Sequence, residues 1–85
     1  MYQGYFRIVN VGPTVSGATE VKIRPLDKWP SGETDDRWFL SAANVPRETL
    51  ATALAALTAA KSVYCEIPDE QTQYSQLSRF LLNAD

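Results

Sequence analysis

The sequence has no histidine and only one cysteine, Cys65. Without histidine, the Ser-His and Cys-His pairs of nucleophilic catalysis cannot be assembled. A single cysteine cannot form an intramolecular disulfide, and no group of Asp, Glu and Cys residues has the spacing of metal ligands. We therefore expect a protein that is not an enzyme and that uses no metal ion and no cofactor.

The sequence also lacks a long apolar run and an excess of basic residues. Residues 50–60 form the longest apolar stretch, which Thr52 and Thr58 interrupt, and it falls well short of the roughly 20 residues that span a bilayer. The 8 Lys and Arg are outnumbered by 10 Asp and Glu, whereas domains that bind nucleic acid electrostatically are usually basic. We expect no membrane insertion, and nucleic acid is an unfavoured partner.

The first residues have neither the basic region nor the apolar region of a secretory signal. The compartment stays open, because the protein would be cytoplasmic if Met1 is the native start and secreted if Met1 precedes a mature domain. A chain of 85 residues is short enough for only one core, so we expect residues 1–85 to be a single domain. Because 10 of its apolar residues are Ala, that core is small and self-association would add stability.

Alternating apolar and polar residues predict strands at residues 2–11 and 19–26, with Val21 and Ile23 facing inward. Glycine and proline between these strands predict a turn. A short apolar strand is expected at residues 37–42. Two further strands follow later in the chain, at residues 62–67 and 75–82.

A helix is predicted at residues 46–61. Pro46 suits its first turn, Glu48 lies near its positive end, and Lys61 lies near its negative end. One stripe of the helix is expected to pack on the sheet: Leu50, Leu54 and Leu57, joined by Ala53 and Ala60. The element order β-β-β-α-β-β predicts a β-barrel with one helix, namely a five-stranded OB-fold. A ferredoxin-like fold would need a second helix, for which no segment has the period and length.

The run TLATALAALTAAKSVYCEI, which begins at Thr49, is an Ala-rich predicted helix that passes directly into a strand. A strand containing Trp38, Phe39 and Leu40 precedes it. In this overall pattern the chain resembles the small OB-fold B subunits of pentameric bacterial toxins of the cholera and pertussis kind. The resemblance implies a ring of barrels in which neighbouring strands pair, helices line the centre, and the outer surface binds glycans. The chain differs from that family in having no cysteine pair and no signal peptide.

One face of the predicted helix carries only small residues, Ala51, Ala55 and Ala59, and residues 49–60 contain no charge. Alanine is also the best helix former on a solvated face. Such a face usually carries Lys, Glu or Arg, so the missing charge favours a contact between identical helices. The last predicted strand is apolar on both faces at its end, where Phe80 and Leu82 are further candidates for the interface. We expect a homo-oligomer, with a pentamer favoured.

The predicted loop at residues 27–36 holds Trp29, which is the leading candidate for a ligand contact. Its indole would stack on a sugar ring or a base, or anchor a subunit interface. Alternatively it folds back over the open end of the barrel. The polar residues around it complete the candidate site: Lys28, Ser31, Glu33, Asp35 and Asp36. Trp38, within an apolar strand, is expected in the core.

A second candidate surface is formed by the outward faces of the first two strands and the loop after them. Aromatic and basic residues lie there, as on OB-folds that bind single-stranded nucleic acid: Tyr5, Arg7, Lys22, Arg24 and Lys28. The leading hypothesis is a non-enzymatic oligomeric binding module, with glycan as the candidate ligand. The alternatives are a single-stranded nucleic-acid-binding OB-fold and a purely structural subunit of a larger assembly.

Overall fold

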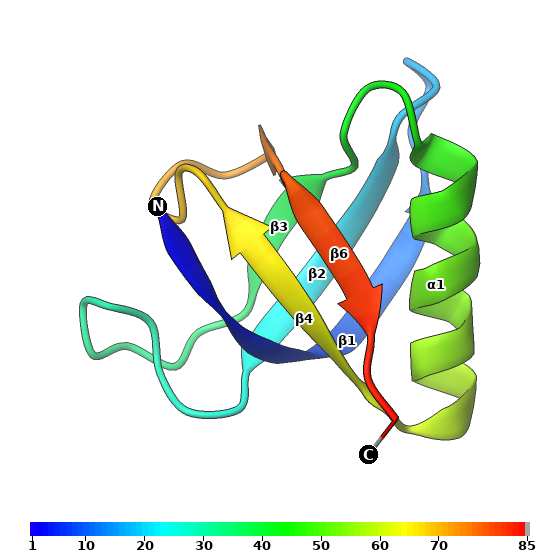
Figure 1. Cartoon of the computed structure of the whole chain (residues 1–85). Helices are drawn as coiled ribbons and strands as arrows, with labels where there is room; N and C mark the ends of the chain where they lie inside the picture. Colours follow the sequence, from blue (N-terminus) through cyan, green and yellow to red (C-terminus); the bar gives the residue numbers. More distant parts are fainter. Residues whose placement is uncertain (85) are drawn as a thin grey trace.

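In the computed structural model, which describes residues 1–84, a strongly curled sheet of six strands packs against one helix (Figure 1). The architecture is barrel-like, with the helix placed between the third and fourth strands. The elements are β1 (Tyr2–Pro13), β2 (Thr19–Pro25), β3 (Arg37–Leu40), α1 (Pro46–Ala59), β4 (Ser62–Ile67), β5 (Ser75–Gln76) and β6 (Arg79–Leu82). The predicted order of strands and helix is confirmed, except that residues 75–82 form two short strands.

The strand order in the sheet is β5-β3-β2-β1-β4-β6, and only the β3–β5 pair is parallel. Two adjacent residues carry the chain from one side of the curled sheet to the other. The Leu77 N–H donates to the Leu40 carbonyl at 2.9 Å, and the Ser78 N–H donates to the Glu66 carbonyl at 2.9 Å. The segment of β5 and β6 therefore contacts both β3 and β4, which curls the sheet toward closure.

The long first strand contains an irregularity that changes which side chains face inward. Its pairing register with β2 shifts between Ile8 and Asn10, as happens when an extra residue bends a strand. Before the shift Phe6 and Ile8 are buried, and beyond it Val11 packs against the core. The bend lets β1 follow the curvature of the sheet and pair with both β2 and β4.

The interior of the curled sheet holds one hydrophobic cluster. The predicted inward placement of Val21 and Ile23 is confirmed, because both are fully buried. Cys65 is also buried, and its burial raises the pKa of the thiol, so that the neutral form persists. This cysteine packs as a small apolar residue of the core.

The helix contacts the sheet through a face that overlaps the predicted one only in part. Its buried residues are Thr49, Ala53 and Ala56, whereas Leu54 and Leu57 remain 47% and 45% exposed. The predicted contact of Ala53 is therefore confirmed, whereas that of Leu54, Leu57 and Ala60 is wrong. Small side chains let the helix backbone approach the curled sheet closely, which long leucines would prevent.

The helix begins at Pro46 as predicted and ends two residues earlier than expected, at Ala59. Ala60 adopts the left-handed conformation that closes many helices, with a φ of 55°. The side chain that contacts this end is Arg7, whose Nη1 donates to the Ala60 carbonyl. The Lys61 ammonium instead donates to the Ala84 carbonyl at 3.1 Å.

Candidate functional site

Trp29 is fully buried, which corrects its expected role as a stacking platform. Its ring lies 5.2 Å from that of Phe6 and 6.0 Å from that of Phe39, measured between centroids. Its indole N–H donates to the Asp35 carbonyl at 2.7 Å, so the polar group of the ring is satisfied inside the fold. Trp29 thus covers the end of the barrel-like sheet, which was the alternative prediction for this residue.

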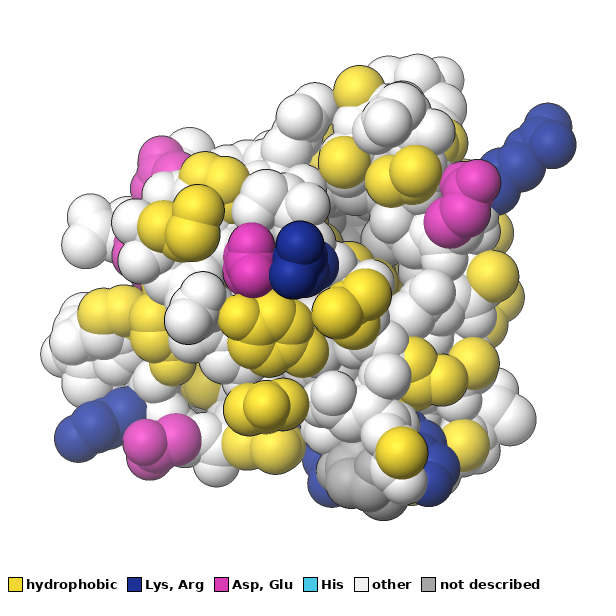
Figure 2. Space-filling model, viewed as in Figure 1, with side chains coloured by type: hydrophobic (Ala, Val, Ile, Leu, Met, Phe, Trp, Pro, Cys, Tyr) yellow, Lys and Arg dark blue, Asp and Glu magenta, His cyan; other side chains and the backbone are white. Residues whose placement is uncertain are grey.

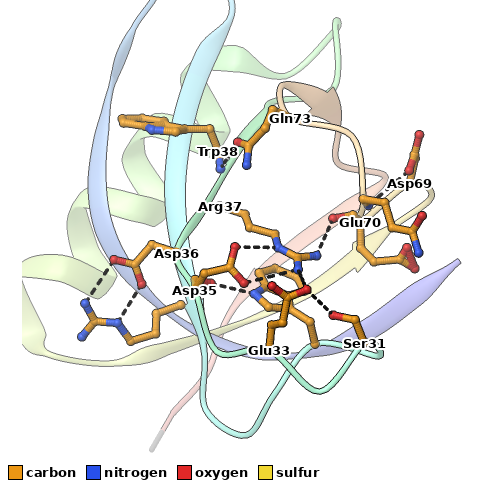
Figure 3. A network of polar contacts seen from close by, with 12 residues as sticks. Ser31, Glu33, Asp35, Asp36, Arg37, Trp38, Asp69, Glu70 and Gln73 are labelled. Carbon is orange, nitrogen blue, oxygen red and sulfur yellow. Dashed lines mark hydrogen bonds and ion pairs between the residues drawn. The ribbon is translucent and has the colours of Figure 1, made fainter.

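Arg37 lies directly above Trp29, with the guanidinium carbon 4.4 Å from the centre of the ring. Its Nε donates to one Asp35 carboxylate oxygen at 3.1 Å, and its Nη2 donates to the other at 3.3 Å. Its Nη1 donates to the Glu70 carbonyl at 3.0 Å (Figure 3). Arg37 therefore ties the loop before β3 to the loop after β4. Hydrogen bonding from Arg37 also lowers the pKa of Asp35.

A polar depression of about 300 Å³ opens between these two loops. Its lining comprises Ser31, Glu33, Asp35, Arg37, Gln71 and Gln73. Three of these residues, Ser31, Glu33 and Asp35, belong to the predicted ligand set. Sequence patterns did not single out Arg37, Gln71 or Gln73, because a charged residue in a strand and two glutamines in a polar loop are ordinary surface composition.

The other predicted ligand residues lie outside this depression. Asp36 accepts two hydrogen bonds from Arg24, at 2.8 and 3.1 Å. This interaction lowers the pKa of Asp36 and raises that of Arg24. Lys28 contacts the rest of the fold through its backbone, because its carbonyl accepts a hydrogen bond from the Tyr2 hydroxyl at 2.9 Å.

The paired carboxylates predict acid sensitivity. Asp35 and Asp36 have pKa values below their usual 3.8 in the folded state, so the stability they contribute is complete above about pH 4 and is lost as the pH falls through the folded values. Thermal melts from pH 7 to pH 2.5 should therefore show a constant midpoint down to about pH 5 and a decline below pH 4. The decline should be shallower in Asp35→Asn/Asp36→Asn, and an equal decline in both proteins would refute the assignment.

Trp38 lies on the outward face of β3 and is half-buried, so its predicted place in the core is wrong. Its neighbour across the sheet is Lys22, whose ammonium nitrogen is 5.7 Å from the centre of the Trp38 ring. On the other side lies Tyr74, whose ring centroid is 6.2 Å away with the two planes 17° apart. Trp38 and the exposed Tyr74 therefore form an aromatic pair on the outward face of the sheet.

Three of the four basic residues proposed for nucleic acid, Arg7, Lys22 and Arg24, engage groups of the protein through their side chains. Arg7 and Arg24 occupy paired positions on β1 and β2. Arg24 is held by Asp36 and Arg7 by the Ala60 carbonyl. Tyr5 is exposed and packs on Tyr64, with ring centroids 5.5 Å apart.

The helix and β6 form an apolar region on another face. The predicted interface residues Ala51, Ala55 and Ala59 are all exposed, and Leu82 at the end of β6 is 46% exposed. Phe80 is partly buried and packs against the core. Figure 2 shows hydrophobic side chains on this face both over β6 and along α1. A hollow of about 210 Å³ separates the two elements, with Glu48 and Arg79 among its lining residues.

Within residues 1–84, no group of three or more His, Cys, Asp or Glu side chains is placed to hold a metal ion. None of the helical segments described is long and apolar enough to cross a membrane. Comparison with protein-family models, with curated proteins and with solved structures gives no match for this chain. Function has to be inferred from the residues and their geometry.

Proposed function

We propose that this chain is a non-enzymatic binding and assembly module with the OB-fold, which forms a homo-oligomer and presents repeated copies of a shallow ligand surface. Repetition of a weak site raises avidity without a deep pocket. A closed ring is the expected assembly, and a pentamer is favoured, as in the toxin B subunits that the sequence pattern resembles. Glycan is the proposed class of ligand.

The path of the last segment supports the OB-fold. β5 pairs with β3 in parallel, and β6 pairs with β4 in antiparallel orientation. If the two are counted as one interrupted strand, five strands close around the core with a helix between the third and fourth, which is the OB arrangement.

The observation that carries the assembly proposal is the uncharged exposed face of the helix. Residues 49–60 contain no charged side chain, yet Leu54 and Leu57 are nearly half exposed. A solvated helix face normally carries charged residues. The apolar surface continues at Leu82 of β6, which is 46% exposed. The occupant that fits this surface is a second copy of the chain, which would supply an equally apolar face.

The position of β6 in the sheet supports the same proposal. Among the described residues, β6 is the last strand of the sheet order and has a neighbour on one side only. An unpaired strand edge is a ready template for pairing with another chain. A contact that joins this edge to a different surface of the next copy is heterologous and closes into a ring when its rotation divides a full turn.

Light scattering of the purified chain at tens of micromolar tests the proposal. We expect a mass of about five times the 9.5 kDa of one chain. Ala55→Glu should dissociate the assembly, because it places a charge inside an apolar contact. Val15→Glu is the matched control, since Val15 is fully exposed in the turn between β1 and β2 and belongs to neither α1 nor β6, and it should leave the mass unchanged.

A monomeric parent protein would overturn the proposed assembly. An Ala55→Glu protein that keeps the parent mass would exclude the helix face as the interface. Circular dichroism of each variant shows whether dissociation is separate from unfolding, because an exposed Ala→Glu change in a helix should leave the helical signal intact.

A further inference from the structure

Tyr74 has a backbone conformation that its residue type disfavours. Its φ angle is 61°, in the left-handed region that glycine and asparagine adopt most readily. Apart from Ala60 at the end of the helix, Tyr74 is the only non-glycine residue among residues 1–84 with a positive φ. Strained conformations of this kind cluster at ligand-binding sites. The Tyr74 ring is nevertheless 51% exposed, so burial of the ring does not account for a tyrosine here.

The Tyr74 ring is held beside Trp38 by the backbone of both residues. The Tyr74 N–H donates to the Trp38 carbonyl at 2.9 Å, and the Trp38 N–H donates to the Gln73 side-chain oxygen at 3.0 Å (Figure 3). The next residues, β5, continue in parallel with β3. These contacts hold the backbones that carry the two nearly parallel rings side by side, and a site positioned by its own fold lowers the entropic cost of binding.

We infer that Trp38 and Tyr74 form a stacking surface for a neutral saccharide on the outward face of the sheet. A pyranose has an apolar face that packs on aromatic rings and a rim of hydroxyls that needs hydrogen-bonding groups. Donors and acceptors are supplied by Arg24 on β2, by its partner Asp36 immediately before β3, and by the Gln73 amide, which contacts Trp38. This inference rests on the binding part of the proposed function and is independent of assembly.

The charges around Trp38 favour a neutral ligand over a polyanion. Lys22 and Arg24 lie on β2 beside it, but Glu20 lies on the same strand, and Asp36 holds Arg24 through two hydrogen bonds. The charges of these four side chains cancel. Single-stranded nucleic acid is held by several cations that replace counterions along its backbone. That requirement is not met here, whereas stacking on a neutral ring needs no net charge.

The two tryptophans allow the site to be tested by NMR, because one is buried and the other lies at the proposed surface. In the ¹⁵N-labelled full chain, the indole N–H signals of Trp29 and Trp38 are followed while chitotetraose, cellotetraose and maltotetraose are added. We expect at least one of these neutral tetrasaccharides to shift the Trp38 signal saturably, while the Trp29 signal stays in place. Sialyllactose and decathymidine are titrated in parallel.

Two variants separate ligand binding from a structural role. Trp38→Ala, followed through the backbone amide signals of β2 and β3 because the variant lacks the Trp38 indole, should weaken saccharide binding by about tenfold, as expected for the loss of an aromatic contact. Tyr74→Gly should weaken binding to a similar extent and leave the thermal midpoint nearly unchanged, because glycine relieves the φ strain as the ring contact is lost. A clear fall in the midpoint with unchanged binding would show that Tyr74 is structural and would overturn the inference.

The inference is also overturned if none of the three saccharides moves the Trp38 signal. It is likewise overturned if sialyllactose or decathymidine binds more tightly than every neutral saccharide. Light scattering on the same samples keeps assembly separate from binding. An Ala55→Glu monomer whose Trp38 signal still responds to saccharide would support this site even where the proposed ring has failed.

Discussion

Replacing Trp29 with alanine is expected to lower the free energy of unfolding by about 3 to 5 kcal/mol. The indole fills the end of the core against the rings of Phe6 and Phe39 and is fully buried, so its removal leaves a large cavity. It also removes the surface on which the Arg37 guanidinium lies. Small domains are stable by only about 5 to 15 kcal/mol, so urea denaturation should show a large drop in the midpoint.

Trp38→Ala is the matched control for this prediction. It removes the same side chain from a half-buried position on the outward face, where solvent fills the space that the ring leaves. The expected cost is about 1 kcal/mol, the value of one aromatic contact. If the two alanine variants lost equal stability, the assignment of Trp29 to the core and of Trp38 to the surface would be wrong.

The exchange of roles between the two tryptophans shows what sequence patterns can and cannot predict. Proline, glycine and several charges predicted the loop at residues 27–36, and for its tryptophan both an exposed ligand contact and a position folded back over the open end of the barrel were left open. In the structure a tight turn directs it inward, with the Gly32 N–H donating to the Trp29 carbonyl at 2.8 Å. The φ of Gly32 is 90°, so the turn needs a glycine. The amino-acid composition of the loop does not reveal that one glycine turns the Trp29 side chain into the core.

The predicted core position of Trp38 was wrong because apolar and polar residues do not alternate in the strand that contains it. Trp38, Phe39 and Leu40 are all apolar, so their sequence does not indicate which face is inward. Arg37 decides the face in the structure, because its guanidinium lies over Trp29 inside the fold, and Trp38 must then point outward. A buried arginine is rare enough that it could not be predicted from sequence.

The candidate site was predicted only in part, because it combines segments far apart in the chain. Ser31, Glu33 and Asp35 were chosen from one loop, and they do line the polar depression. Gln73 and Tyr74 come from the loop after β4 and reach β3 only through the parallel pairing of β5. Parallel pairing of two residues carries no sequence signal of its own, so this half of the site required the structure.

The orientation of the helix could not be predicted from hydrophobicity, because side-chain size determines which helix residues contact the sheet. Leucine stripes usually face a core, and here Leu54 and Leu57 are exposed while Ala53 and Ala56 lie against the sheet. A curled sheet with aromatic side chains inside already fills its interior. The helix then approaches closely only where its side chains are short, so alanine takes the contact and leucine remains available for a second copy.

Ala53→Glu should consequently be among the most damaging single substitutions in the helix. Ala53 is fully buried between α1 and the sheet, so a glutamate there has no room and no partner for its charge. Burying an unpaired charge costs several kcal/mol, and the added side chain would also push the helix away. We expect a protein that is largely unfolded at 25 °C, or one whose urea midpoint falls by more than that of any surface variant.

Ala55→Glu is the control for this last prediction, because it makes the same change two residues further along the same helix. Ala55 is exposed, so its substitution should leave the fold of the single chain intact and alter only assembly. Circular dichroism and urea denaturation therefore distinguish the two variants. We expect Ala53→Glu to lose structure and Ala55→Glu to retain it. If Ala53→Glu were tolerated and Ala55→Glu unfolded the chain, the helix would pack through the opposite face. The face that carries Ala55 would then contact the core, and the face that carries Ala53 would be the exposed candidate interface.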